Sequence, residues 1–179
     1  PNVGTDPAGF RAWLHANQPL LKPSGVPHGF GNHRKRESLD AYSENGTGGV
    51  VESYVNWVAP PRTHQGLVQE ALGNAQRDRR KAFDLLYHSM AVVRRFGRLA
   101  RFDYLTMLGK LELAPIEPGL PYLQGATGPL VGARLLFGTN ESAALLDQWI
   151  EELDAQLNVG MQVWEDALCN WQKSPAQFK

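Results

Sequence analysis

Cysteine is almost absent from this sequence, which contains Cys169 and no other. A single cysteine excludes an intramolecular disulfide, a CxxC motif and a cysteine-based zinc site, and this pattern is typical of an intracellular protein. The five histidines form no HxxxH or HxH pair, and no serine lies in a GxSxG motif. We therefore expect no metal centre and no bound cofactor, and the sequence does not support a standard hydrolase.

Long apolar runs and an excess of either charge are also missing. No stretch of about 18 apolar residues exists, and no charged segment precedes an apolar one at the N-terminus, so we expect neither a membrane span nor a secretion signal but a cytoplasmic protein. Pro1 favours a native start after removal of the initiator methionine, and a sequence cut before Pro1 would look the same. Lys and Arg total 18, as do Asp and Glu. Any DNA-binding surface must therefore come from local clusters of basic residues.

The apolar residues recur mostly at helical spacing, which predicts an all-α fold in a single domain. Helices are predicted over about residues 6–16, 63–72, 77–96, 102–111, 129–137, 140–157 and 159–171. Residues 50–58 have a strand-like composition without a partner strand, so this stretch is left open as extended or helical. The helix that continues from about residue 77 to residue 101 and the helix over 140–157 are expected to pack together through Phe83, Leu86, Met90, Leu145, Trp149 and Leu153.

The N-terminal third is the part of the chain with the weakest core pattern. Residues 17–50 are rich in proline and glycine, which predicts a long irregular segment with a short helix near 37–42. We divide the single domain into residues 1–60, a helix and an irregular arm packed on the core, and residues 61–179, the helical core. The basic run in the arm is a candidate DNA contact, with disorder in the absence of ligand as the alternative. This run consists of Arg34, Lys35 and Arg36.

Four arginines are concentrated between residues 94 and 101. If a helix continues through Gly97, Arg94, Arg98 and Arg101 share one face and could hold a phosphate or pyrophosphate through charge-assisted hydrogen bonds. Asp103 is the nearest acid and a candidate catalytic base. The alternative is a solvated basic face with Asp103 capping the next helix.

A glycine-containing loop before a helix that starts near Pro129 is the second candidate site. It would present backbone N–H groups to an anion at a helix N-terminus, although it lacks the Lys-Ser/Thr ending of a P-loop. The candidate phosphate-binding residues are Gln124, Gly125, Thr127 and Gly128. This loop loosely resembles the hairpin of helix-hairpin-helix DNA glycosylases, whose catalytic Asp lies about 20 residues further on. Asp147 stands at that spacing and is a second catalytic candidate, with the exposed side of an amphipathic helix as its alternative.

One ordered string of motifs resembles a known family. It comprises Arg95-Phe96-Gly97-Arg98-Leu99-Ala100-Arg101-Phe102-Asp103-Tyr104-Leu105, Ile116-Glu117-Pro118, Tyr122-Leu123-Gln124-Gly125-Ala126-Thr127-Gly128-Pro129 and Gly132-Ala133-Arg134-Leu135-Leu136. The string is similar to the alpha-glutamyl/putrescinyl thymine pyrophosphorylases, the amino acid:DNA transferase group of phage thymine hypermodification. The similarity covers about residues 80–155.

The resemblance implies a helical, DNA-glycosylase-like fold and an enzyme of phage DNA modification. Its partners would be DNA that carries 5-pyrophosphomethyl-uracil and an amine or amino acid, which displaces pyrophosphate from the modified base. The arginines would stabilise the leaving pyrophosphate, and Asp103 or Asp147 would take a proton from the amine. The base would be reached by flipping or deep groove access. Aromatic candidates for holding it are Tyr104, Tyr122 and Trp57, each of which also fits the core.

Two other functions remain open on the sequence. A DNA glycosylase would use the same fold to excise a modified base, and a non-catalytic module would only bind modified DNA. All three need basic residues and a pocket, so the sequence does not separate them. Abasic sites would mark the glycosylase, and binding without chemical change would mark the module.

Overall fold

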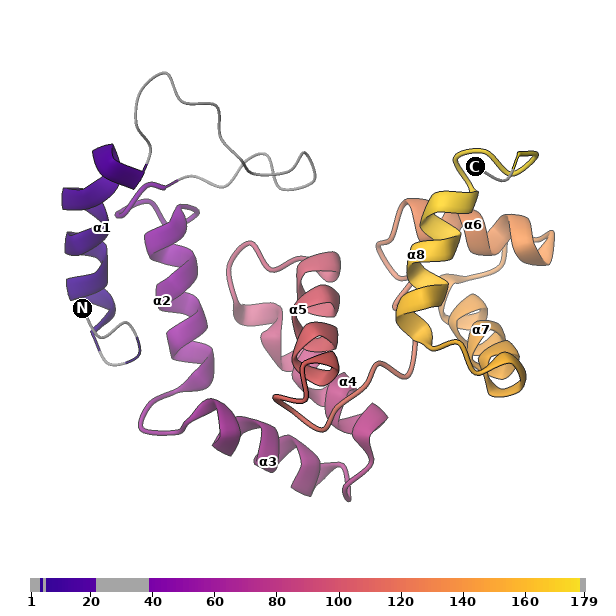
Figure 1. Cartoon of the computed structure of the whole chain (residues 1–179), viewed down its shortest axis with the longest axis horizontal. Helices are drawn as coiled ribbons and strands as arrows, with labels where there is room; N and C mark the ends of the chain where they lie inside the picture. The colour runs from indigo at the N-terminus through magenta and orange to yellow at the C-terminus, as the bar shows by residue number, and fades with distance from the viewer. Residues whose placement is uncertain (1–3, 5, 22–38, 178–179) are drawn as a thin grey trace. The chain divides into compact units, whose positions relative to one another are not determined.

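The computed structural model describes residue 4, residues 6–21 and residues 39–177. Eight α-helices and one 3-10 helix form the described part of the chain, which contains no strand (Figure 1). This confirms the predicted all-α fold. The chain divides into two compact units, residues 1–67 with 89–96 and residues 68–88 with 97–179. Each unit is described here by itself.

The first unit contains α1 (Pro7–Leu21), α2 (Thr47–Val58), the 3-10 helix η2 (Met90–Val92) and the first residues of α3 (His64–Asn74). Asp6 caps α1, because its Oδ1 accepts the Gly9 N–H at 2.8 Å. The predicted helix near residue 6 is therefore confirmed, and it runs beyond residue 16 to Leu21. Arg11 on α1 forms an ion pair with Glu52 on α2.

The stretch that the sequence left open as extended or helical is α2. Ahead of it, residues 39–46 are irregular, so no helix covers 39–42, and residues 37 and 38 lie outside the described residues. The backbone of this irregular segment packs tightly on the first turn of α2, since a Cβ on Gly48 would lie 1.9 Å from the Ala41 carbonyl oxygen. Burial of one face, which includes Val55 and Val58, decides in favour of the helix.

The second unit contains α4 (Arg79–Ser89), α5 (Arg98–Lys110), α6 (Gly128–Phe137), α7 (Ala143–Leu157), α8 (Met161–Trp171) and the rest of α3. The prediction of one helix from about residue 77 to residue 101 is wrong. α4 ends at Ser89, Arg95 takes a positive φ of 64°, and Gly97 is the N-cap of α5. The chain therefore turns between α4 and α5, and the residues on either side of Gly97 do not share a helical face.

The core of the second unit has an aromatic part and an aliphatic part. Phe83 on α4 packs edge-on against Phe102 on α5, with ring centroids 6.2 Å apart, and lies 5.8 Å from the Tyr122 ring. The aliphatic part joins α6, α7 and α8, which lie together in Figure 1. Its fully buried members include Leu123, Leu146 and Ile150. The residues of α4 and α7 that were predicted to pack together thus belong to two different parts of the core.

The buried face of α7 differs from the predicted one. Leu145, Trp149 and Leu153 are only half-buried, and Ala144 is exposed. The buried residues are Ala143, Leu146, Asp147, Ile150 and Asp154. This face is rotated from the apolar stripe because it includes two acids, which a search for apolar periodicity does not select.

Glycine permits the close packing of α6 on α8. A Cβ on Gly132 would lie 2.4 Å from the Leu168 carbonyl oxygen, and a Cβ on Gly128 would lie 2.9 Å from the Cys169 Sγ. These two glycines are four residues apart and lie on one face of α6. Gly128, a candidate phosphate ligand in the sequence, therefore has a packing role.

Candidate functional site

Seven side chains of the second unit form a connected polar and aromatic cluster, here called the arginine–carboxylate cluster. They come from α4, α5, the connector before α6, α7 and α8. The members are Asp84, Tyr87, Arg98, Arg101, Tyr122, Asp147 and Glu165. These residues span more than 80 positions of the chain, so only the tertiary fold brings them together.

Asp147 is the buried acid of the cluster, with 6% of its surface exposed. Both of its carboxylate oxygens accept the Leu123 N–H, at 3.0 and 3.2 Å. Burial raises the pKa of Asp147 from its ordinary 3.8 to about 6, although the Leu123 hydrogen bond and the positive charge of Arg98 act in the opposite direction. At neutral pH it is a carboxylate with an affinity for protons well above that of an ordinary aspartate.

Arg98 is the central cation of the cluster. Its Nη1 donates to the carbonyl oxygens of Pro121 and Tyr122, each at 3.3 Å, and its Nη2 forms an ion pair with Glu165. The side chains of Arg98 and Glu165 are 13% and 5% exposed, so water screens this pair weakly. Arg98 thereby links the start of α5 to the connector and to α8.

Tyr122 shapes the connector beside Asp147. It has a positive φ of 54°, a left-handed conformation that is unusual for a bulky residue and indicates local strain. Its ring stacks on Tyr87 with centroids 3.9 Å apart, and its hydroxyl donates to Asp84 Oδ1 at 3.1 Å. Burial and the neighbouring Asp84 raise its pKa, so the hydroxyl stays a donor. These contacts hold the Leu123 N–H, one residue on, against Asp147.

Arg101 is the second cation of the cluster. Its guanidinium lies 4.4 Å from the centroid of the Tyr87 ring, and its Nη1 donates to the Tyr87 carbonyl oxygen at 3.1 Å. Its buried Nε has no hydrogen-bond partner among the described residues. Arg101 therefore has one N–H donor that the described part of the chain does not use.

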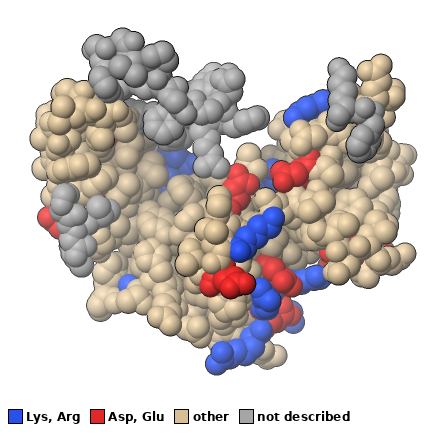
Figure 2. Space-filling view, in the orientation of Figure 1, with Lys and Arg blue, Asp and Glu red and all other residues tan. Residues whose placement is uncertain are grey.

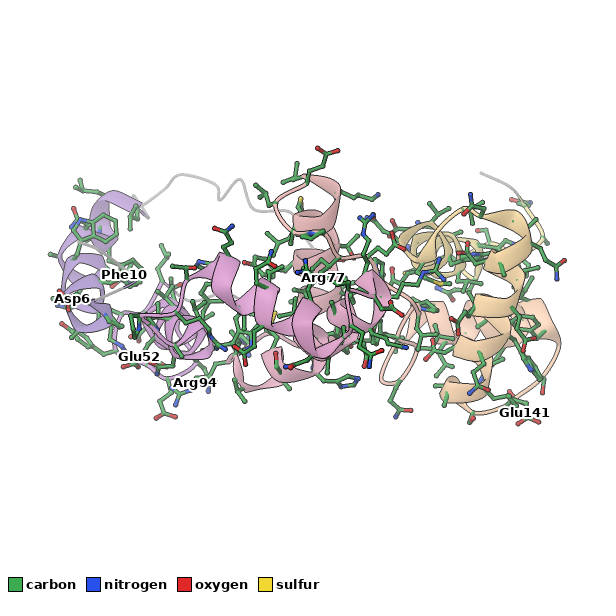
Figure 3. The ribbon with its side chains drawn as sticks, turned by 90° about the horizontal axis from the view of Figure 1, so that it is seen from below. Asp6, Phe10, Glu52, Arg77, Arg94 and Glu141 are labelled. Atoms are coloured by element: carbon green, nitrogen blue, oxygen red, sulfur yellow. The ribbon has the colours of Figure 1, made fainter. Side chains whose placement is uncertain are left out.

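Arg94 belongs to a different unit from Arg98 and Arg101. Arg94, labelled in Figure 3, belongs to the first unit, where its Nη2 lies 3.5 Å from Glu44 Oε1. The three arginines cannot share a helical face because the chain turns before Gly97. The predicted helical face shared by all three arginines is therefore wrong, and a role of Arg94 in phosphate binding stays a prediction.

Asp103 lies on a different side of α5 from the two arginines. Five residues of α-helix turn it by about 140° from Arg98, and Asp103 is half-buried there. Asp147 is a member of the cluster, whereas Asp103 lies on another side of α5. A catalytic role for Asp103 stays a prediction.

The loop before α6 directly follows Leu123. Gln124, Gly125 and Thr127 are exposed, and Gly125 has a φ of 75°, which favours glycine. No side chain caps the first turn of α6 within the described part of the chain. The loop can offer N–H groups to an anion, and this role stays a prediction.

Glu165 is the member of the cluster that the sequence analysis missed. It lies on the buried face of α8 with Met161 and Leu168. An acid at an otherwise apolar core position is the signal that would have found it, since an unpaired buried acid is costly. The same signal applies to Asp147 on α7, whose alternative placement on an exposed face is wrong.

The surface carries charges of both signs in close proximity. On the face shown in Figure 2, Lys and Arg side chains lie next to Asp and Glu side chains. The basic run of Arg34, Lys35 and Arg36 lies outside the described residues. His88 is exposed and lies 3.2 Å from Asp84, at the edge of the cluster. Within the described residues, no helix is long and apolar enough to cross a membrane.

The second unit is thus an all-helical unit with a buried carboxylate of raised pKa, two arginines and an ordered backbone connector. The comparison with known families identifies one family. The chain belongs to the family alpha-glutamyl/putrescinyl thymine pyrophosphorylase clade 3, whose model matches residues 1–179. The family assignment from the motifs is confirmed and extends beyond residues 80–155 to the N-terminal region. No curated protein and no solved structure matches the chain.

Proposed function

We propose that this protein is a transferase of thymine hypermodification that displaces pyrophosphate from 5-pyrophosphomethyl-uracil in DNA with an amine or amino acid. Family membership supports the thymine chemistry. The arginine–carboxylate cluster supports the reaction, because a displacement of this kind needs a proton acceptor and a cation for the leaving group. The observation that carries the proposal is the buried Asp147, held beside Leu123 with a pKa of about 6.

In the proposed reaction the amine nitrogen attacks the 5-methylene carbon of the base. A carbon–nitrogen bond forms, the carbon–oxygen bond to pyrophosphate breaks, and pyrophosphate leaves with the electron pair. The attacking nitrogen becomes positively charged and loses a proton to Asp147. A base with a pKa near the working pH is well suited to this transfer, because it is ionised before the step and holds the proton afterwards.

Arg101 is the proposed ligand of the leaving pyrophosphate. Its Nε has no partner among the described residues, and its guanidinium is held in place by the Tyr87 ring and carbonyl. Negative charge on the leaving oxygen grows in the transition state, so a fixed donor there lowers the barrier. Arg98 supports the arrangement by anchoring the connector, and a direct contact between Arg98 and pyrophosphate stays a prediction.

The decisive experiment is mass spectrometry of nucleosides from DNA bearing 5-pyrophosphomethyl-uracil, after incubation with the protein and a mixture of amino acids and polyamines. We expect loss of pyrophosphate and gain of one amine mass. Asp147→Asn should lower the rate by about 100-fold or more, because the amide cannot accept the proton. The matched control is Asp166→Asn, the same change at an exposed position of α8, which should leave the rate unchanged.

The other outcomes contradict the proposal in distinguishable ways. Abasic sites without amine incorporation would identify a glycosylase, for which a buried carboxylate could stabilise positive charge on the sugar. Retention of the modified DNA with no change in mass would identify a binding module. An Asp147→Asn rate within about twofold of wild type would move the proton acceptor elsewhere, with Asp103 next to be tested.

A further inference from the structure

A separate cleft of about 360 Å³ lies in the second unit, away from the members of the arginine–carboxylate cluster. Its walls come from the starts of α4 and α8, the end of α5 and the loop between α7 and α8. The volume falls within the range of about 300 to 1,000 Å³ that small-molecule sites span. The residues described below show which chemistry fits this cleft.

The outer part of the cleft is basic. Arg79, Arg80 and Lys110 line it, and all three are exposed. Glu117 lies 3.9 Å from Arg79 and 3.4 Å from Arg80, so one acid is shared by two arginines, and Lys110 has no ion-pair partner among the described residues. With Asp154 also in the lining, three basic side chains stand against two acids, which leaves one positive charge in excess for an anionic group of a ligand.

The start of α8 adds backbone donors to the same cleft. α8 begins at Met161, and no side chain of the described residues caps its first turn. Asp154 Oδ1 instead accepts the N–H groups of Val159 and Gly160 and the indole N–H of Trp164, at 2.8 to 3.1 Å. Asp154 therefore orders the loop, while the N–H groups of the first helical turn remain available for an anion.

Two buried polar atoms of the lining residues lack partners. Thr106 is 4% exposed, and neither its Oγ1 nor Gln162 Oε1 has a hydrogen-bond partner among the described residues. A buried carbonyl oxygen without a donor is costly, so its presence beside a cleft points to a ligand that brings a donor. These two oxygen atoms thus lack a donor, whereas the exposed basic side chains and the helix start favour an anion.

We propose that this cleft holds the amine co-substrate before it reaches Asp147 and selects an α-amino acid over a diamine, with the carboxylate toward Lys110 and the start of α8 and the ammonium toward Gln162 and Thr106. This inference rests on the proposed function for the use of the amino acid. Helix geometry places the cleft and the cluster on the same two helices. Gln162 lies one turn before Glu165 on α8, and Asp154 lies two turns, about 10 Å, beyond Asp147 on α7.

The test is calorimetric titration of the full chain, with and without a DNA duplex, using four probes: L-alanine, ethylamine, propionate and putrescine. Ethylamine lacks the carboxylate of alanine and propionate lacks its ammonium, so both should bind more weakly than L-alanine. Putrescine should also bind more weakly, because it has no anionic group for Lys110. Equal or tighter binding of putrescine, or no binding of L-alanine in either condition, overturns the proposal.

Substitutions then locate the site. Lys110→Gln should weaken L-alanine binding about three- to fivefold. The matched control Lys81→Gln removes a lysine on α4 that pairs with Asp78 and does not line the cleft, and it should leave binding unchanged. If both variants bind L-alanine equally well, the amino acid binds elsewhere.

Thr106→Val separates a ligand contact from a structural role. Valine keeps the shape and removes a buried hydroxyl without a partner, so the melting temperature should stay the same or rise, while L-alanine binding should weaken up to about tenfold. Unchanged binding overturns the contact with Thr106. If amines are incorporated into DNA but these binding tests fail, the proposed role of the cleft is wrong and the proposed function stands. If L-alanine binds in the cleft but no amine is incorporated, the proposed function is wrong and the binding site stands.

Discussion

At the scale of single residues, the balance of burial and charge decides what each acid and base can do. Asp147 and Glu165 are both buried, yet Glu165 has a direct cationic partner in Arg98, while Asp147 is held by a backbone N–H. The pKa of Asp147 rises because loss of hydration outweighs that hydrogen bond and the charge of Arg98. A strong ion pair thus organises the cluster, and the acid beside it keeps its reactivity toward protons.

The raised pKa of Asp147 predicts a specific dependence of stability on pH. The folded-state pKa is about 6 and the ordinary value is 3.8, so between these values the folded state binds more protons than the unfolded state. Raising the pH from about 4 to about 6 should therefore lower the contribution of Asp147 to the free energy of unfolding, by about 2 to 3 kcal/mol. Urea unfolding of wild type and Asp147→Asn across this range measures it, since asparagine does not titrate.

Asp166→Asn is the control for that comparison, because it removes an exposed carboxylate from α8. Its unfolding free energy should follow that of wild type at every pH. Parallel pH curves for wild type and Asp147→Asn would show that the pKa of Asp147 is the same in both states.

The Arg98–Glu165 pair predicts a large effect of removing one partner. Arg98→Ala leaves Glu165 buried without its cation and should lower the free energy of unfolding by about 3 to 5 kcal/mol. Chemical denaturation measures this loss. The double variant Arg98→Met, Glu165→Leu should recover most of it, since neither charge is then left unpaired.

An exposed pair provides the comparison. Arg80 and Glu117 have side chains 48% and 45% exposed, so Arg80→Ala should cost less than about 1 kcal/mol. If the Arg98→Ala and Arg80→Ala variants had the same free energy of unfolding, the buried pair would not anchor the connector.

At the scale of helices, termini and glycines set the positions of the site residues. Gly97 is the N-cap of α5, so Arg98 stands in the first turn and reaches the carbonyl oxygens of the connector. Gly128 and Gly132 bring α6 against α8, the helix that carries Glu165. The second glycine of the candidate phosphate loop therefore serves packing, which its sequence pattern alone does not distinguish from anion binding.

The α6–α8 contact predicts opposite effects for the same substitution at two glycines. Gly132→Ala places a Cβ 2.4 Å from the Leu168 carbonyl oxygen, and the backbone must shift at a cost of about 1 to 3 kcal/mol. Gly73→Ala on α3 meets nothing within 4 Å and should raise stability by about 0.5 to 1 kcal/mol, because alanine favours helix. Thermal unfolding measured by circular dichroism checks both, and a neutral Gly132→Ala would contradict the close packing.

At the scale of the whole molecule, charge governs the interaction with DNA. The chain has as many acidic as basic residues, so binding to duplex DNA should be modest and should weaken steeply as salt rises, because phosphate contacts release counterions. Fluorescence anisotropy with a labelled duplex at increasing salt measures this. Affinity that stays flat from low to physiological salt would exclude an electrostatic origin.

The basic run in the N-terminal arm contributes a second expectation at this scale. Changing Arg34, Lys35 and Arg36 together to alanine should weaken binding to all sequences alike and reduce the salt dependence. The matched control changes Arg77, Arg79 and Lys81 to alanine, which removes equal charge from another part of the chain. A larger loss with the control would assign the DNA contact to the start of α4.

The sequence by itself determined the helical class and the family, because apolar periodicity, helix caps and ordered motifs are local properties. Asp6 at the start of α1 and the glycine break before α6 are read directly from neighbouring residues. Only the tertiary structure decided which acid lies near the arginines. It excluded Arg94 from helix α5 through the turn before Gly97, set Asp103 on another side of α5 and buried Asp147 and Glu165. Burial of a charge depends on neighbours distant in the chain, and no local pattern encodes that desolvation.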